Sequence, residues 1–219
     1  MRTRIAAVVV SLVGLGVPAA VAPSTATASA ATTVKIIVMP VTASGHAAAG
    51  FTVKVEHLGF GIGCDFKDPS PGALSPNIEE CAPSAAYAIA CWKAAAPGKV
   101  LCMRDPSSHK VYKIKRQGKF KNTAIAKPRD RAPLMIVLAD GSTCQIRDGG
   151  AWPQPKGRPN LYAAYSCAKY GVAWTYAKGR HRDPHNGIDE SSSTWRIRVG
   201  EKHVVWRKIA KAYFVATAP

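Results

Sequence analysis

Hydrophobic positions alternate with polar ones over short stretches along most of the chain, and turn residues separate these stretches at close intervals. In one of them, Trp195, Ile197 and Val199 alternate with Arg196 and Arg198. A period of two is typical of a strand with one buried and one wetted face. We therefore predict an all-β fold, in which antiparallel sheets form a disulfide-stabilised sandwich or barrel-like structure with at most one or two short helices.

Eleven runs fit a strand. The expected strands are Thr33–Met39, Phe51–His57, Tyr87–Lys93, Lys99–Arg104, Lys110–Lys115, Leu134–Ala139, Ser142–Arg147, Leu161–Ala168, Gly171–Ala177, Thr194–Val199 and His203–Thr217. Ala96-Pro97-Gly98 marks a turn, and Asp140-Gly141 predicts a type I′ hairpin because Asp-Gly is favoured there. The Ala-rich stretches Pro83–Ala90 and Lys208–Ala216 allow a short helix instead, although Tyr213-Phe214-Val215 in the second favours a strand.

Residues 1–30 have the three parts of an export signal. Met1-Arg2-Thr3-Arg4 is cationic, Ile5–Val17 is a run of 13 mostly apolar residues, and Ala28-Ser29-Ala30 forms an A-x-A cleavage site before Ala31. The apolar run is shorter than the ~20 residues that cross a bilayer, which favours a cleaved signal over a membrane anchor. We expect a secreted protein, extracellular or peripherally associated with the cell envelope, because no later stretch is long and apolar enough to span a membrane.

The chain is strongly basic, with 30 Lys and Arg against 13 Asp and Glu and a formal net charge of +17. Residues 31–103 are balanced at zero, whereas residues 104–131 carry +8, residues 132–168 carry +1 and residues 169–219 carry +6. Such an excess bears on partners and solubility rather than on the fold.

The basic segment also suggests how the mature chain is divided. Prolines bound it, so we expect an N-terminal β-rich half, residues 31–131, that ends in the basic segment, and a C-terminal β-rich half, residues 132–219. A single domain over residues 31–219 is the alternative.

Six bases are the candidate surface for an anionic partner. They are Lys110, Lys113, Lys115, Arg116, Lys119 and Lys121. The functional interpretation is electrostatic docking to an anionic envelope polymer or lipid surface, and the plain one is a solvated face that keeps the protein in solution. Four aromatic residues, Tyr112, Phe120, Trp195 and Trp206, lie among the bases of the two basic segments, but interleaved aromatics are a weak sign of nucleic-acid binding without a recognised fold.

The six cysteines contain no C-x-x-C pair, which argues against zinc-ribbon and thioredoxin-like sites. In an exported protein structural disulfides are the default. Six cysteines allow 15 pairings, of which the sequential one is favoured. Cys91 and Cys102 flank the hairpin at Pro97-Gly98. Cys64–Cys81 would close a Pro-rich loop, and Cys144–Cys167 would join two C-terminal strands.

One cluster carries candidate chemistry. It comprises His181, Asp183, His185, Asp189 and Glu190. Pro184 prevents helical spacing of the two histidines, Arg180 and Arg182 repel a cation, and no G-x-S-x-G elbow surrounds Ser191-Ser192-Ser193. No P-loop, Rossmann or H-E-x-x-H motif occurs. We expect a polar surface loop here, with no metal, no cofactor and no catalytic residue.

The C-terminal half contains a series of short motifs, namely Leu138-Ala139-Asp140-Gly141-Ser142-Thr143-Cys144, Gly149-Gly150-Ala151-Trp152, Ala164-Tyr165-Ser166-Cys167, Gly187-Ile188-Asp189, Ser193-Thr194-Trp195, Arg198-Val199-Gly200 and Ala212-Tyr213-Phe214-Val215. With these motifs it resembles a group of small exported actinobacterial proteins. The resemblance covers roughly residues 60–219, more loosely at Cys64 and over Cys91–Asp105. It implies export and a disulfide-bonded β domain, and it carries no catalytic residue to this chain.

These observations favour a secreted, cationic, non-enzymatic protein that associates with anionic envelope or extracellular material. A secreted enzyme inhibitor or host-interacting effector, with a protein target bound by a loop such as Lys178–Glu190, is the second hypothesis. A small extracellular hydrolase is the third. Electrostatic docking weakens steeply with salt, whereas a packed inhibitor interface weakens little.

The export signal gives the first prediction. We expect the mature protein to begin at Ala31, or within about three residues of it, because signal peptidase cleaves after A-x-A. N-terminal sequencing of protein from the culture medium measures this. A mature species that still carries Met1–Val17 would contradict the assignment and indicate a membrane-anchored protein.

Overall fold

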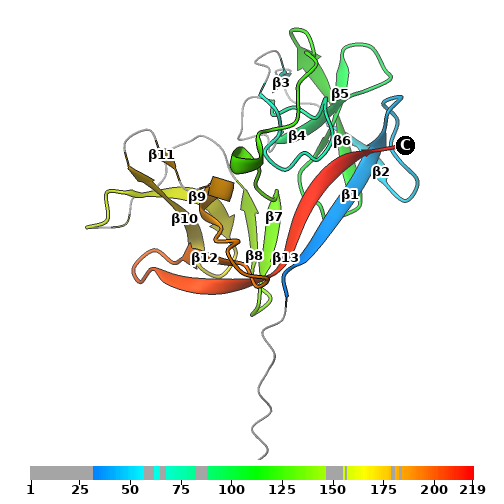
Figure 1. The fold of residues 1–219 in the computed structure, drawn as a ribbon. Helices are drawn as coiled ribbons and strands as arrows, with labels where there is room; N and C mark the ends of the chain where they lie inside the picture. The colour runs from blue at the N-terminus through cyan, green and yellow to red at the C-terminus, as the bar shows by residue number, and fades with distance from the viewer. Residues whose placement is uncertain are drawn as a thin grey trace, which may run out of the picture.

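The computed structural model describes residues 32–56, 62–64, 68–81, 88–146, 155, 157–178, 181–182 and 184–219 (Figure 1). In this part the strands are β1 (Val34–Thr42), β2 (Thr52–Val55), β3 (Ile62–Gly63), β4 (Ala90–Lys93), β5 (Lys99–Met103), β6 (Lys110–Gln117), β7 (Met135–Leu138), β8 (Thr143–Ile146), β9 (Leu161–Cys167), β10 (Gly171–Lys178), β11 (His181–Arg182), β12 (Arg196–Val199) and β13 (Val205–Ala218). Two short 3-10 helices are η2 (Pro128–Asp130) and η3 (Pro184–Gly187). The all-β prediction is confirmed.

All eleven expected runs contain a strand, and only the two-residue strands β3 and β11 were not predicted. The stretch Lys208–Ala216 is strand rather than helix, because β-branched and aromatic side chains there are buried between strands. The predicted signal, residues 1–30, and most of Pro83–Ala90 lie outside the described residues.

Six strands close into a barrel in the order β13-β12-β10-β9-β8-β7, with β7 pairing back to β13. All of these pairings are antiparallel. Along one edge, β13 pairs with β12 as far as Lys208 and with β1 from Lys211 onward. The last strand therefore continues out of the barrel toward the second sheet (Figure 1).

The second sheet has the order β2-β6-β5-β4, and β3 also pairs with β6. Among the strands that the structure describes, three pairings are parallel, namely β1 with β13, β2 with β6 and β3 with β6. This differs from a purely antiparallel arrangement. Parallel partners need a long connection, and here the chain between them supplies it: β4 and β5 intervene between β3 and β6, for example.

Strand alternation gives the second sheet two buried faces. Leu101 and Met103 of β5 face the main core, whereas Val100 and Cys102 face a smaller cluster that includes Ile114. Because β5 is buried on both sides, it shows no alternation of apolar and polar residues.

The main core joins the second sheet to the barrel. Trp92 and Met103 from the second sheet belong to the same buried cluster as Ile136, Tyr165 and Ile197 from the barrel. The Tyr165 hydroxyl is fully buried and donates a 3.0 Å hydrogen bond to the Pro133 carbonyl oxygen. One hydrophobic cluster thus extends through both predicted halves.

The three disulfides have the predicted sequential pairing: Cys64–Cys81, Cys91–Cys102 and Cys144–Cys167. Two of them join directly opposed residues of neighbouring strands, β4 with β5 and β8 with β9. No free cysteine occurs in the part of the chain that the structure describes.

The two predicted turns differ in outcome. Lys99 N–H donates to the Ala96 carbonyl and Gly98 has a φ of +66°, which confirms the first turn. At the β7–β8 hairpin only Gly141 of the Asp-Gly pair has a positive φ, +82°, so the predicted type I′ turn is wrong. Three residues lie between the hydrogen-bonded Leu138 and Ser142, and the third of them, Gly141, takes the left-handed conformation.

A polar network closes the barrel end at this hairpin. The Asp140 carboxylate accepts hydrogen bonds from Lys169 Nζ at 2.9 Å and from the Tyr170 hydroxyl, and Arg207 Nε donates to the same hydroxyl at 3.2 Å. These side chains come from three separate hairpins. Tyr170 also packs against the main core, so the hydrogen bonds that connect the three hairpins lie next to buried apolar side chains.

The Cys144–Cys167 disulfide gives a stability prediction. Replacing both cysteines with alanine should lower the free energy of unfolding by about 3 kcal/mol, because the unfolded chain regains the freedom of a loop with a sequence separation of 23 residues. Urea unfolding followed by circular dichroism measures this. Ser166→Ala, at an exposed neighbouring position, is the control and should leave the midpoint unchanged. An unchanged midpoint in the double variant would contradict the prediction.

Candidate functional site

Strand β6 carries four of the six predicted bases and distributes them over two faces of the second sheet. Lys113 and Lys115 alternate with buried Ile114 and share a face with Val111. Lys110 and Arg116 fall on the opposite face by the same period of two. The structure therefore does not bring the six predicted residues together on one surface.

The neighbouring strand adds a lysine that the sequence analysis missed. Lys99 of β5 lies directly opposite Lys115 of β6, and Leu101 lies opposite Lys113. Directly opposed residues of an antiparallel pair project from the same face. Lys99, Lys113 and Lys115 therefore share one face, which only the pairing register of β5 with β6 reveals.

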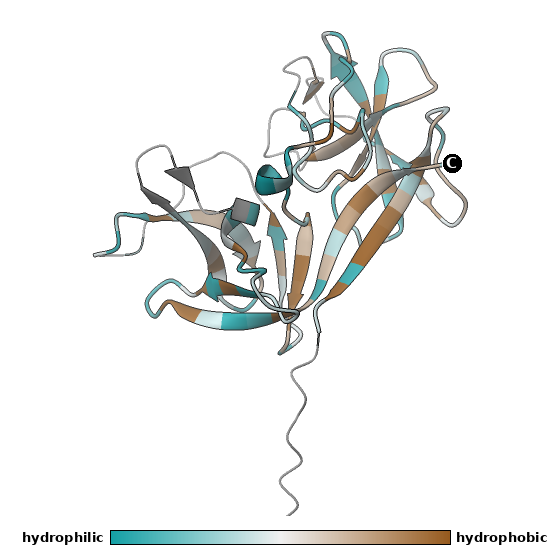
Figure 2. Cartoon of the chain, in the orientation of Figure 1, coloured by the Kyte–Doolittle hydropathy of each residue, from teal (hydrophilic) through white to brown (hydrophobic). Residues whose placement is uncertain are grey.

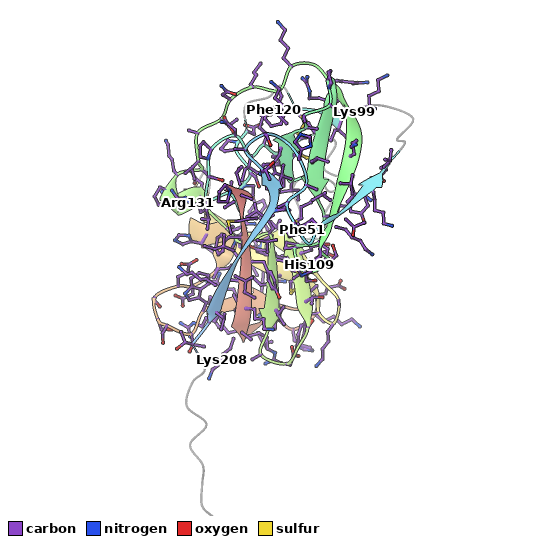
Figure 3. The ribbon with its side chains drawn as sticks, turned by 90° about the vertical axis from the view of Figure 1, so that its right-hand side faces the viewer. Phe51, Lys99, His109, Phe120, Arg131 and Lys208 are labelled. Atoms are coloured by element: carbon purple, nitrogen blue, oxygen red, sulfur yellow. A yellow bond between two sulfur atoms is a disulfide. The ribbon has the colours of Figure 1, made fainter. Side chains whose placement is uncertain are left out.

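We define the lysine surface as Lys99, Lys113, Lys115 and Lys119. Lys119 is exposed and follows the end of β6, beside Phe120. Figure 3 shows Lys99 and Phe120 at the same end of the molecule. Lys99, Lys113 and Lys121 are all half-buried, whereas Lys115 is exposed. Arg116 donates a hydrogen bond to the Gly118 carbonyl next to its own strand.

Acidic groups are missing from this sheet. Its strands contain seven bases, Lys54, Lys93, Lys99, Lys110, Lys113, Lys115 and Arg116, and no Asp or Glu. None of the ion pairs formed among the described residues includes a member of the lysine surface. Arg104, by contrast, pairs with Glu56 and stacks on Tyr112 at 4.5 Å from the ring centroid. The like charges of the lysine surface are thus left uncompensated by these ion pairs.

The cluster near residue 185 forms a second polar site. His185, Asn186 and Gly187 have consecutive positive φ values of +50°, +56° and +87°. Left-handed conformations are costly for residues other than glycine, and a run of them is rare. At Gly187 a Cβ atom would lie 2.6 Å from the Trp174 carbonyl oxygen and from the Thr175 Cα, so glycine is required there.

This turn places His185 Nδ1 3.1 Å from the Arg131 carbonyl oxygen and 3.7 Å from Glu190 Oε1. A carbonyl oxygen only accepts, so in the neutral ring Nδ1 carries the proton and Nε2 is left as the proton acceptor. Among the described residues no group of three or more His, Cys, Asp or Glu is placed to hold a metal ion.

Asp189 and Glu190 point into different environments. Burial raises the pKa of Glu190 above its usual value, while the charges of His185 and Lys35 oppose this shift. Hydrogen bonds from Ser191 and from Arg196 lower the pKa of Asp189 to about 2. The two neighbouring carboxyl groups therefore do not act as a pair.

The remaining members of the predicted cluster contribute differently. Ser192 Oγ donates to the Thr194 carbonyl at 2.8 Å, and Ser191 N–H donates to Asp189 at 3.1 Å, so these serines form the turn before β12. The His181 side chain and Asp183 lie outside the described residues. The structure brings together His185 and Glu190 and no others of the cluster that it describes.

Comparison of the chain with protein-family models, with curated proteins and with solved structures finds no match. The resemblance described from the sequence motifs therefore stays a prediction. Among the described residues, none of the helices has the length and apolar character of a membrane span.

The opposite pKa shifts predict opposite effects on stability. Above pH 4.5 the unfolded chain loses the Glu190 proton before the folded one does, so stability falls as pH rises through the window up to the raised pKa. Glu190→Gln removes this loss and should gain stability relative to the wild type across that window. Denaturant unfolding at a series of pH values measures it, and parallel profiles would contradict it.

Asp189→Asn is the matched comparison. The lowered pKa of Asp189 stabilises the folded state above about pH 4, and this contribution is lost as pH falls toward about 2. Asp189→Asn should therefore be less stable than the wild type near neutral pH and equal to it near pH 2. A deficit that persists at pH 2 would show that the effect is not electrostatic.

Proposed function

We propose that this protein is a secreted, cationic, non-enzymatic protein that associates with anionic cell-envelope or extracellular material through the lysine surface. The observation that carries the proposal is the direct cross-strand pairing of Lys99 with Lys115 on a sheet whose strands contain no carboxylate. Opposed like charges destabilise a strand pair. An anion bound between them removes this cost, so the folded protein favours a polyanion there.

The framework beneath the lysine surface supports this proposal. The Cys91–Cys102 disulfide joins β4 to β5, and β5 is buried on both faces, so the backbone that carries Lys99 is held firmly. Disulfides persist in oxidising compartments, in keeping with the export signal predicted at residues 1–30. A rigid scaffold lowers the ordering cost when several lysines contact one ligand.

A protein target is the competing hypothesis, and salt separates the two. Each lysine that neutralises a phosphate releases a condensed counterion, so the affinity for a polyanion falls steeply with ionic strength. An inhibitor-like interface built on the Lys178–Glu190 region would keep most of its affinity. The lysine surface and that region lie on different strands, so variants can address them separately.

Charge reversal of the lysine surface tests the proposal. The triple variant Lys113→Glu, Lys115→Glu, Lys119→Glu should bind labelled long-chain polyphosphate more weakly, and its slope of log affinity against log salt should be shallower by roughly 2, since three contacts are lost. Fluorescence anisotropy over a salt series measures both. Lys115 and Lys119 are exposed and contribute little to stability, whereas Lys113 is half-buried, so circular dichroism of the variant must show an intact fold before its binding is compared.

The matched control reverses three exposed bases outside the lysine surface: Lys127→Glu, Arg158→Glu, Lys211→Glu. It makes the same change in net charge and should keep most of the affinity and slope. Equal losses in both variants would show that overall charge governs binding. Wild-type binding by the first variant at every salt concentration would refute the proposal and favour the protein-target hypothesis.

A further inference from the structure

The outer face of the barrel carries a second basic surface. Arg196 lies directly opposite Lys208 in the β12–β13 pair, and Arg198 lies directly opposite Trp206. The intervening Ile197 is fully buried in the barrel core, so its neighbours Arg196 and Arg198 project outward. We call this surface the arginine–tryptophan face, and its members are Arg196, Arg198, Trp206 and Lys208.

Trp206 organises the two arginines. Their guanidinium carbons lie 4.8 Å (Arg196) and 4.4 Å (Arg198) from the centroid of the Trp206 ring, within the range of a cation–π contact. The indole remains 39% exposed. A guanidinium stacked by its flat face keeps N–H groups at its edge, and these match the oxygens of a phosphate or carboxylate.

Two arginines and a lysine gather on this face. Arg196 Nε donates to Asp189 Oδ2 at 2.8 Å, so a carboxylate holds the first of the two arginines in place. Lys208 is exposed and opposes Arg196 directly, which repeats the like-charge pairing of Lys99 with Lys115. An anion would relieve this repulsion as well.

The two basic surfaces lie at opposite ends of the molecule. Figure 3 places Lys99 at one end and Lys208 at the other, and Figure 1 shows the same separation of β5 from the β12–β13 hairpin. Between them runs β1, a strand that Figure 2 shows as largely hydrophobic. Its apolar residues Val34, Ile37 and Met39 are exposed. The surfaces are therefore two separate sites.

We propose that the arginine–tryptophan face is a second anion-binding site, and that the two sites together let one molecule bridge two segments of a linear, phosphate-bearing polymer. The proposal rests on the function proposed for the lysine surface. A flat membrane meets one end of the molecule at a time, whereas flexible chains reach both ends, so a polymer fits the arrangement better than a lipid surface. Two sites on one body also raise avidity for a long polymer.

Long-chain polyphosphate and tripolyphosphate are the probes, because only the long chain can join two molecules. Wild-type protein should bind two tripolyphosphate ions in titration calorimetry. It should also cross-link the long polymer into assemblies that scatter light, and these assemblies should dissolve when the polymer is in excess. Three triple variants, which lower the net charge by the same amount, are compared with the wild-type protein. They are K113Q/K115Q/K119Q at the lysine surface, R196Q/R198Q/K208Q at the arginine–tryptophan face, and K127Q/R158Q/K211Q as the control.

Each surface variant should bind one tripolyphosphate ion and should lose the cross-linking, whereas the control should behave as wild type. Trp206→Leu keeps every charge and removes the stacking platform. It should weaken binding at the arginine–tryptophan face several-fold, which overall charge cannot explain. Because it alters one exposed side chain, it also tests the face if the triple variant does not fold.

The remaining outcomes separate the two proposals. Wild-type cross-linking by R196Q/R198Q/K208Q, or unchanged binding by Trp206→Leu, would overturn the bridging proposal and leave the lysine surface as it stands. Loss of all binding in R196Q/R198Q/K208Q, with wild-type behaviour of K113Q/K115Q/K119Q, would overturn the function proposed for the lysine surface. Equal losses in all three triple variants would overturn both.

Discussion

The pairing of β13 with three other strands is the constraint on which the rest of the structure depends. β13 completes the barrel by pairing with β12 and β7. Its later residues pair with β1 in parallel, where the strand runs toward the second sheet. Its register with β7 shifts between Ile209 and Lys211, where its other edge passes from β12 to β1. Ala212 and Val215 are fully buried, because side chains on both faces of this stretch pack into the main core. Without this strand neither the barrel nor the junction with the second sheet could be completed.

Much of the fold could be predicted from the sequence, because strand runs and tight turns leave local signals. The alternation at Trp195–Val199 is visible without any partner strand, and the hairpin at Pro97-Gly98 brings Cys91 opposite Cys102. The parallel pairings could not be predicted, because nothing local to Val34 indicates that it lies beside Lys211. Register between distant strands is decided by packing, which no short window of sequence contains.

The candidate sites show the same division. Basic residues near β6 are obvious from composition, but their separation onto two faces and the addition of Lys99 follow from pairing. The contact of His185 with the Arg131 carbonyl depends on three consecutive left-handed residues, and among these Asn186 and Gly187 signal that conformation in the sequence. The stacking of Arg196 and Arg198 on Trp206 likewise requires the β12–β13 register. The sequence shows which residue types are present, whereas the fold decides which of them lie next to one another.

The position of β13 in the chain has a consequence for the order of events in folding. Each of its strand partners precedes it, and β1 is separated from it by nearly the whole described chain. Neither the barrel nor its junction with β1 can form until β13 has been synthesised, and contacts of such long sequence separation make folding slow. The export signal predicted at residues 1–30 gives this delay a use: a chain that still lacks β13 cannot close its barrel, and an unclosed chain passes through a narrow translocation channel more easily than a folded one.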